Sequence, residues 1–140
     1  MPTRHLPVSD LPIYPTHTCF DDALDFLVDV LRDNPRERAA LAQQLFLVHG
    51  LCQAPDGRLY AHAWVEDAVE DTCIFTGILD GTRRVFATPA HEYYAEVRVQ
   101  EMTRYNLIQA LQNNRFTNSY GPWEARYQAQ VWPPGYGGRP

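Results

Sequence analysis

The sequence predicts an α+β fold in which an N-terminal helix packs on an antiparallel sheet and further helices follow toward the C-terminus. Two observations support this class. Apolar residues recur with a helical period before residue 45 and then adopt strand-like patterns. The strand-like segments follow one another with short turns between them, and helices come before and after this run. That order favours an antiparallel sheet over a parallel βαβ arrangement.

The first helix is expected to begin after Thr18, because Thr18-Cys19-Phe20-Asp21 has the Thr-x-x-Asp form of a capping box. Apolar residues then fall on one helical face, namely Leu24, Leu27, Val28 and Leu31. Asn34-Pro35 ends this helix, since a residue before proline disfavours helical geometry. A second helix is expected over 36–44, with Ala39, Ala40 and Leu41 on its buried side.

Four strands are expected over 45–51, 58–66, 72–79 and 82–88. Ala54-Pro55-Asp56-Gly57 separates the first two as a turn, and Asp80-Gly81 is a strong hairpin signal between the last two. Two helices are expected to follow, over 89–95 and over 103 to about 113.

The chain is expected to hold one domain, over 18–132, between two irregular ends. Residues 1–17 contain four prolines and no helical period, which predicts an extended N-terminal arm. Residues 133–140 are rich in proline and glycine and predict a flexible tail.

Composition and charge limit the classes of partner. The formal net charge is −5 and the pI is near 5.4, and the arginine pairs Arg36/Arg38 and Arg83/Arg84 are short. We therefore expect neither nucleic acid nor an anionic membrane surface as a partner. No apolar run approaches the ~20 residues of a membrane span, and the N-terminus does not resemble a signal peptide. Three cysteines are an odd number, so reduced thiols in a cytoplasmic protein are expected.

Cys19 is the first candidate for chemistry. In the first turn of a helix, unpaired backbone N–H groups and the helix dipole stabilise a thiolate. The same N–H groups serve as oxyanion donors when a carbonyl is attacked. The alternative is that Cys19 is only a small apolar residue at a helix start.

His62 is the second candidate. On a strand, Tyr60, His62, Trp64 and Glu66 share one face, and the small apolar residues between them share the other. The small face suits packing against a helix, and the aromatic face is expected to form the rim of a cleft around His62. We expect Tyr60 and Trp64 to contact substrate, with His49 on the neighbouring strand lining the same cleft. A hydrogen-bonded core histidine is the alternative.

Ala61-His62-Ala63-Trp64-Val65-Glu66 resembles the His-Ala-Trp-Val-Glu strand of bacterial transglutaminase-like cysteine peptidases, including the lasso-peptide leader peptidases. Val48-His49-Gly50-Leu51 resembles the glycine-bearing strand of that family, and Cys19 with its amphipathic helix resembles the nucleophile helix. The similarity spans roughly residues 18–88. It implies a papain/transglutaminase-like fold with Cys19 as nucleophile and His62 as general base.

The resemblance does not identify a single acid that would orient His62. Asp80, at the end of the strand after His62, is the favoured residue, and Asp71, at its start, is the alternative. Asp80-Gly81 also makes sense as a turn alone, in which case the site is a dyad or is inactive. A metal site from His49, Cys52, His62 and Cys73 is the weaker interpretation, because the spacing fits no compact zinc pattern.

The resemblance implies a thiol-dependent acyl-transfer enzyme that hydrolyses, deamidates or transamidates a peptide or protein, without a cofactor. A toxin-like deamidase delivered to another cell would use the same residues. The rival from a different class is a catalytically degenerate module that binds a peptide or protein partner. The oligomeric state is not readable from the sequence.

Overall fold

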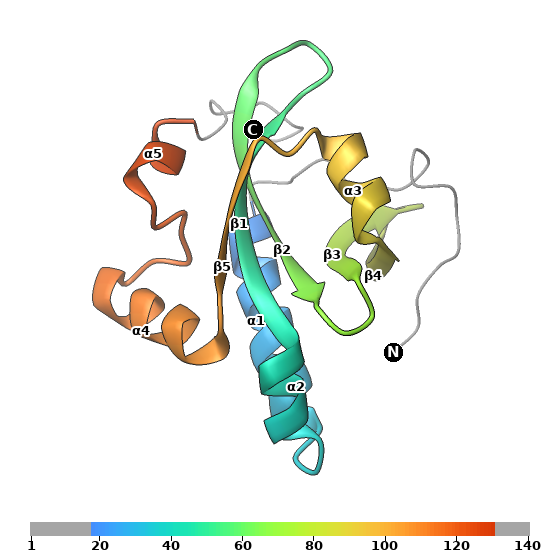
Figure 1. Cartoon of the computed structure of the whole chain (residues 1–140), viewed down its shortest axis with the longest axis vertical. Helices are drawn as coiled ribbons and strands as arrows, with labels where there is room; N and C mark the ends of the chain where they lie inside the picture. The colour runs from blue at the N-terminus through green and yellow to red at the C-terminus, as the bar shows by residue number, and fades with distance from the viewer. Residues whose placement is uncertain (1–17, 131–140) are drawn as a thin grey trace.

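The computed structural model describes residues 18–130, which form one five-stranded antiparallel sheet with helices on both sides (Figure 1). The expected arm over 1–17 and tail over 133–140 lie outside the described residues. The elements in chain order are α1 Cys19–Asp33, α2 Arg38–Gln44, β1 Leu45–Gln53, β2 Leu59–Asp67, β3 Thr72–Leu79, β4 Thr82–Pro89, α3 Ala90–Val97, β5 Glu101–Tyr105, α4 Leu107–Thr117 and α5 Ala125–Gln128.

The strands lie in the order β4-β3-β2-β1-β5, and every neighbouring pair is antiparallel. The predicted α+β class, with an N-terminal helix on an antiparallel sheet and C-terminal helices, is therefore confirmed. The sheet is tightly joined at its centre, where β1 and β2 pair along nine positions. It is weakly joined between β2 and β3, where the register contains only three pairs, from Val65↔Ile74 to Asp67↔Thr72.

One face of the sheet is covered by α1, which lies behind the strands in Figure 1. The apolar stripe of α1 packs against small and branched residues of the strands, since Leu24, Leu27 and Leu31 share a core cluster with Ala63 and Val65. This confirms that the small face of β2 packs against a helix.

The opposite face is covered by α3, beside β3 and β4 (Figure 1). Tyr93 of α3 belongs to a cluster with Tyr60 and Trp64 of β2. The ring of Trp64 lies over Gly50 of β1, where an added Cβ would come within 2.6 Å of the indole. Glycine at this position therefore leaves the space in which the indole is buried.

Several element boundaries differ from the sequence expectation. The segment 103–105 is part of strand β5, so the expected helix from 103 is wrong there, and α4 begins at Leu107. Ala39 and Ala40 of α2 are exposed rather than buried. Thr18 does precede α1, but its hydroxyl bonds to the carboxylate of Asp22 instead of capping the backbone.

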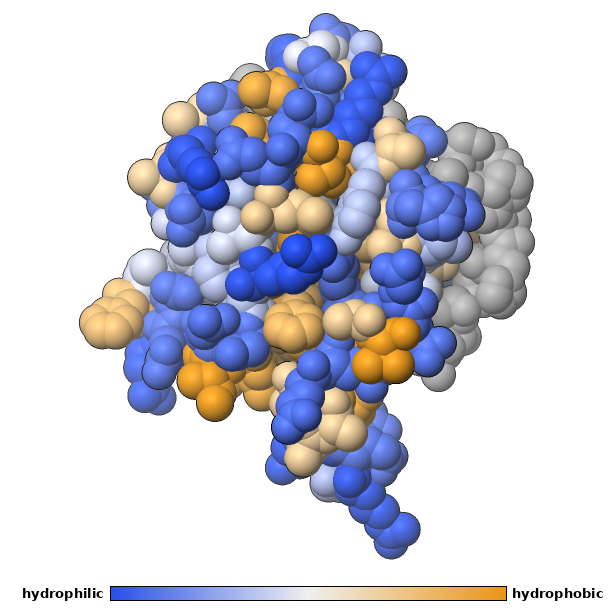
Figure 2. Space-filling model, viewed as in Figure 1, coloured by the Kyte–Doolittle hydropathy of each residue, from blue (hydrophilic) through white to orange (hydrophobic). Residues whose placement is uncertain are grey.

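The face of the molecule seen in Figure 2 is mainly hydrophilic, with apolar residues in scattered small patches. Isolated exposed apolar side chains are ordinary on protein surfaces. Within residues 18–130, no helix combines the length and the apolar character needed to cross a membrane.

Candidate functional site

Cys19 and His62 reach the same small cavity from different elements. The cavity lies between α1, β2 and β3, and it is lined by Cys19, Asp22, Ala23, Phe26, His62, Ala63, Trp64, Val65, Ile74, Phe75 and Thr76. It has room for about one water molecule. The cavity lies at the point where β2 and β3 stop pairing, so the sheet itself leaves the gap.

The interrupted pairing also frees a backbone donor beside the thiol. The N–H of Ala61 points away from β1 and donates to the carbonyl of Gln130. Ala63 lies two residues further along, so its N–H points to the same side, toward the missing part of β3. This N–H interacts with the sulfur of Cys19 instead of with a strand.

The thiol of Cys19 is neutral in this environment. Cys19 is 9% exposed, and burial raises its pKa to about 12, with the carboxylates of Asp22 and Asp21 adding to the rise. Hydrogen bonding by the backbone of Ala63 and Phe20 lowers the pKa but does not offset the burial. The N-terminal helix position alone therefore does not produce a thiolate.

The imidazole of His62 is also neutral. His62 is 3% exposed, and burial lowers its pKa to about 3. Its Nε2 lies 2.6 Å from the hydroxyl oxygen of Tyr93 on α3. Its Nδ1 has no hydrogen-bond partner among the described residues.

Neither candidate acid bonds to His62. Asp80 lies in the β3–β4 hairpin turn with φ 54°, followed by Gly81 with φ 76°, as a two-residue type I′ turn requires. Asp71 lies in the β2–β3 turn with φ 56°. The side chain that hydrogen-bonds to the imidazole is that of Tyr93, which is not among the residues predicted from the sequence.

The sequence predicts Tyr60, Trp64 and His49 around a cleft, but all three side chains are buried. Tyr60 and Trp64 are fully buried in the core beneath α3, and Trp64 also lines the cavity. His49 pairs with Ala63, whereas His62 pairs with Gly50. Since neighbouring strand residues point to opposite faces, the structure does not bring His49 beside His62.

His49 is instead enclosed on the α1 face by the rings of Phe20, Tyr105 and Trp123, with centroids 4.8–5.1 Å away. Both of its ring nitrogens are without a partner among the described residues. Burial lowers its pKa to about 3. No group of three or more potential metal ligands occurs within residues 18–130.

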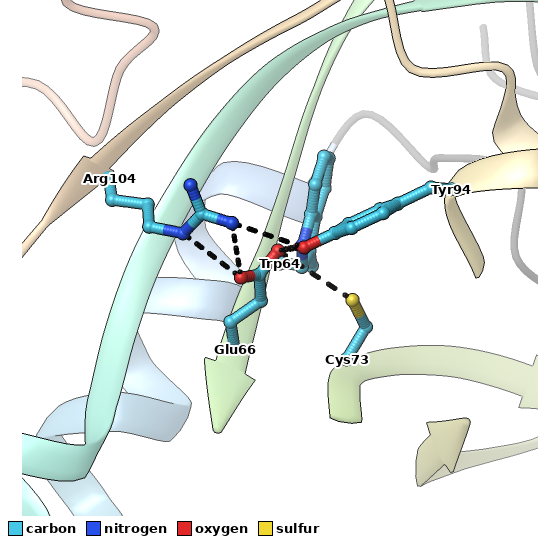
Figure 3. Close-up of polar contacts among 5 residues, drawn as sticks. All are labelled: Trp64, Glu66, Cys73, Tyr94 and Arg104. Atoms are coloured by element: carbon cyan, nitrogen blue, oxygen red, sulfur yellow. Dashed lines mark hydrogen bonds and ion pairs between the residues drawn. The ribbon is translucent and has the colours of Figure 1, made fainter. Parts of the chain in front are cut away.

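Glu66 of β2 is a buried carboxylate with several polar partners, and it is not among the site residues predicted from the sequence (Figure 3). Oε1 of Glu66 accepts from Nε and one terminal nitrogen of Arg104, at 3.1 and 2.9 Å. Oε2 accepts from the hydroxyl of Tyr94 and from the indole N–H of Trp64, and the thiol of Cys73 lies 3.8 Å away. The sequence gives one sign of this cluster, which is an acidic residue on the same strand face as Tyr60, His62 and Trp64. A charge that is buried needs polar partners, so such a position predicts a cluster around it.

The Glu66 cluster joins four elements, because its members come from β2, β3, α3 and β5. It also fixes the indole of Trp64, whose ring lies 5.4 Å from that of His62. The cluster therefore supports the strand from which His62 projects.

Comparison of the chain with protein-family models, with curated proteins and with solved structures gave no match. The interpretation of the site accordingly depends on its own geometry.

Proposed function

We propose that the chain is a thiol-dependent acyl-transfer enzyme of papain/transglutaminase-like fold, in which Cys19 is the nucleophile and His62 the base. The observation that carries the proposal is the shared cavity, which is lined by Cys19 at a helix start and by His62 on a strand, with the backbone N–H of Ala63 beside the thiol. These are the components of nucleophilic catalysis by cysteine.

The chemistry follows from the positions of these groups. The sulfur of Cys19 attacks the carbonyl carbon of an amide or thioester, and its proton passes to Nδ1 of His62, the ring nitrogen not bonded to Tyr93. The N–H of Ala63 donates to the developing oxyanion. The proton then moves to the leaving group as its bond to carbon breaks, and water or an amine releases the acyl group from sulfur. The substrate is a peptide or side-chain amide of a protein.

The burial of Cys19 means that a substrate reaches it only after the cavity opens. The β3–β4 hairpin forms one wall of the cavity and is tied to β2 by three residue pairs. Near its outer end, Arg83 of β4 forms an ion pair with Asp22 of α1, at 2.6 Å, and Asp22 lines the cavity. The opening that we propose is therefore a separation of the hairpin from α1, which breaks this ion pair.

The proposal is tested with an activated acyl ester, which acylates a nucleophilic thiol without a requirement for substrate recognition. Intact mass and peptide mass measurements locate the acyl group and give its rate of formation. We expect acylation at Cys19, no acylation in Cys19→Ser, and a rate at least about tenfold lower in His62→Gln, within the range for general-base catalysis.

The matched control is Cys52→Ala, which removes another buried thiol and leaves the rate unchanged. An acylation rate at Cys19 that is the same with and without the His62 imidazole would refute the proposed pair.

The second candidate is a non-catalytic module that binds a peptide or protein. It is favoured by the neutral state of both groups, since burial raises the pKa of the thiol to about 12 and lowers that of the imidazole to about 3. The absence of a carboxylate bonded to His62 within residues 18–130 points the same way. Binding of a peptide that survives Cys19→Ser, with no acylation of the wild-type protein, would favour this module.

A further inference from the structure

The two ring nitrogens of His62 have unequal surroundings. Nε2 is hydrogen-bonded to the hydroxyl of Tyr93, and Nδ1 has no partner in the part of the chain that the structure describes. Within residues 18–130, the hydroxyl of Tyr93 has no hydrogen bond other than the one to His62. Both side chains are buried, at 3% exposure for His62 and 0% for Tyr93, and Tyr93 does not line the cavity, so bulk water does not reach the phenol.

The two neutral tautomers of His62 leave different numbers of groups unsatisfied. With the proton on Nδ1, the hydroxyl of Tyr93 donates to Nε2, and only the Nδ1–H lacks a partner. With the proton on Nε2, that N–H donates to the phenol oxygen. The phenol proton and the Nδ1 lone pair then both lack partners. Since each buried unsatisfied group costs free energy, the arrangement with the proton on Nδ1 is favoured.

We propose that Tyr93 is a positioning residue that holds His62 in the Nδ1–H tautomer, so that the ring nitrogen not bonded to Tyr93 carries a proton in the resting protein. This inference rests on the proposed function and describes how its site is restrained. Acyl transfer then begins only after one proton has moved from Nδ1 to Nε2, with no change in net charge. In that second state the Nε2–H donates to the oxygen of Tyr93.

A carboxylate at the position of Tyr93 would have the opposite effect. A carboxylate only accepts hydrogen bonds, so it favours a proton on the nitrogen beside it and leaves a lone pair for the nucleophile. A phenol also donates, and the described residues offer this one no acceptor other than His62. Tyr93 thus occupies the place of the orienting acid while favouring the inactive tautomer.

The phenol is held in place and stays neutral. The ring of Tyr93 packs against those of Phe75 and Trp64, with centroids 5.1 and 5.3 Å away. Burial raises the pKa of Tyr93 well above its usual value, so the hydroxyl keeps its proton. Asp22, the carboxylate lining the cavity, bonds to Thr18 and Arg83.

Nitrogen NMR of protein labelled with ¹⁵N in the histidine ring tests the tautomer directly. Near pH 7, we expect the His62 signals of the wild-type protein to show a protonated Nδ1 and an unprotonated Nε2, with at least about a tenfold excess of this tautomer. In Tyr93→Phe, which removes only the hydroxyl, the excess falls at least severalfold, and alkylation of Cys19 by iodoacetamide becomes faster.

Tyr105→Phe is the matched control. It removes another buried hydroxyl beside a buried histidine, His49, on the opposite face of the sheet. We expect the tautomer of His62 and the alkylation rate of Cys19 to be unchanged in it. A wild-type spectrum with the proton on Nε2, or an equal tautomer ratio in wild type and Tyr93→Phe, overturns the inference.

The tautomer experiment and the acyl-transfer experiment test the two hypotheses independently. The spectrum is recorded without substrate, so a protonated Nδ1 in a protein that shows no His62-dependent acylation refutes the proposed function alone. His62-dependent acylation in a protein with the proton on Nε2 refutes the inference alone. Should Tyr93→Phe fail to fold, the wild-type spectrum still decides between the two tautomers.

Discussion

Acidification from pH 8 to pH 5 is expected to remove about 4 kcal/mol of folding free energy, because two buried histidines remain neutral in the folded protein. Burial lowers the pKa of both His49 and His62 to about 3. In the unfolded chain both groups titrate near the ordinary value of about 6.5. The unfolded state therefore binds protons first as the pH falls, and the contribution is lost between about pH 6.5 and pH 3.

The magnitude follows from the difference between the two states. Below pH 6.5 each histidine contributes about 1.4 kcal/mol per pH unit, so two histidines over about 1.5 units give the stated loss. Urea denaturation followed by tryptophan fluorescence, repeated at half-unit intervals of pH, measures the slope of stability against pH.

His49→Gln and His62→Gln are each expected to remove about half of that slope. His91→Gln is the control, because it removes a histidine whose side chain is 80% exposed and not buried. Uptake of fewer than about one proton per molecule on unfolding at pH 5.5 would contradict the neutral burial of these two rings.

Two further predictions concern ion pairs. Arg83→Gln removes the ion pair between the hairpin and Asp22 of α1 at the cavity wall. We expect alkylation of Cys19 by iodoacetamide to become at least about twofold faster. The effect is small because an exposed ion pair contributes little free energy. Arg84→Gln, the neighbouring exposed arginine, is the control, and equal rates in both variants would exclude a role for the pair in access. Glu66→Gln weakens the bonds to a buried carboxylate and is expected to destabilise the fold by about 2–3 kcal/mol in urea denaturation. Arg126→Gln is the control, because it breaks an exposed ion pair with Glu101 and is expected to lower stability by at most about 1 kcal/mol. An equally small loss of stability in Glu66→Gln would show that the buried cluster is not stabilising.

Local sequence patterns predicted the helices and turns whose conformation is determined by residues within the element itself. The helix opened by Cys19 is set by its apolar period, and the turn at Asp80 by its favourable dipeptide, so both are found where expected. The sequence predicts a helix over 103–105, whereas these residues belong to β5, because this short segment gains strand character only by pairing with β1, far away in sequence. Exposure of Ala39 and Ala40 likewise depends on where the sheet lies relative to α2.

The candidate site was predictable only in part, for the same reason. Cys19 and His62 were found from a helix start and a short strand resemblance, and both line the cavity. The face on which His49 lies depends on the register between β1 and β2, and a shift of one residue would reverse it. Tyr93 contacts His62 across 31 positions of sequence, and Glu66 contacts Arg104 across 38. No local pattern encodes such contacts.

The short ladder between β2 and β3 divides the sheet into two parts, β5-β1-β2 and the β3–β4 hairpin. β5, β1 and β2 are joined by long registers, whereas the β3–β4 hairpin joins them through three pairs and its side-chain packing. Amides of the hairpin would then exchange with solvent through a partial opening that leaves the β5-β1-β2 part folded. Reactivity at the buried sulfur would be governed by the population of that opened form, and global stability would have little influence on it.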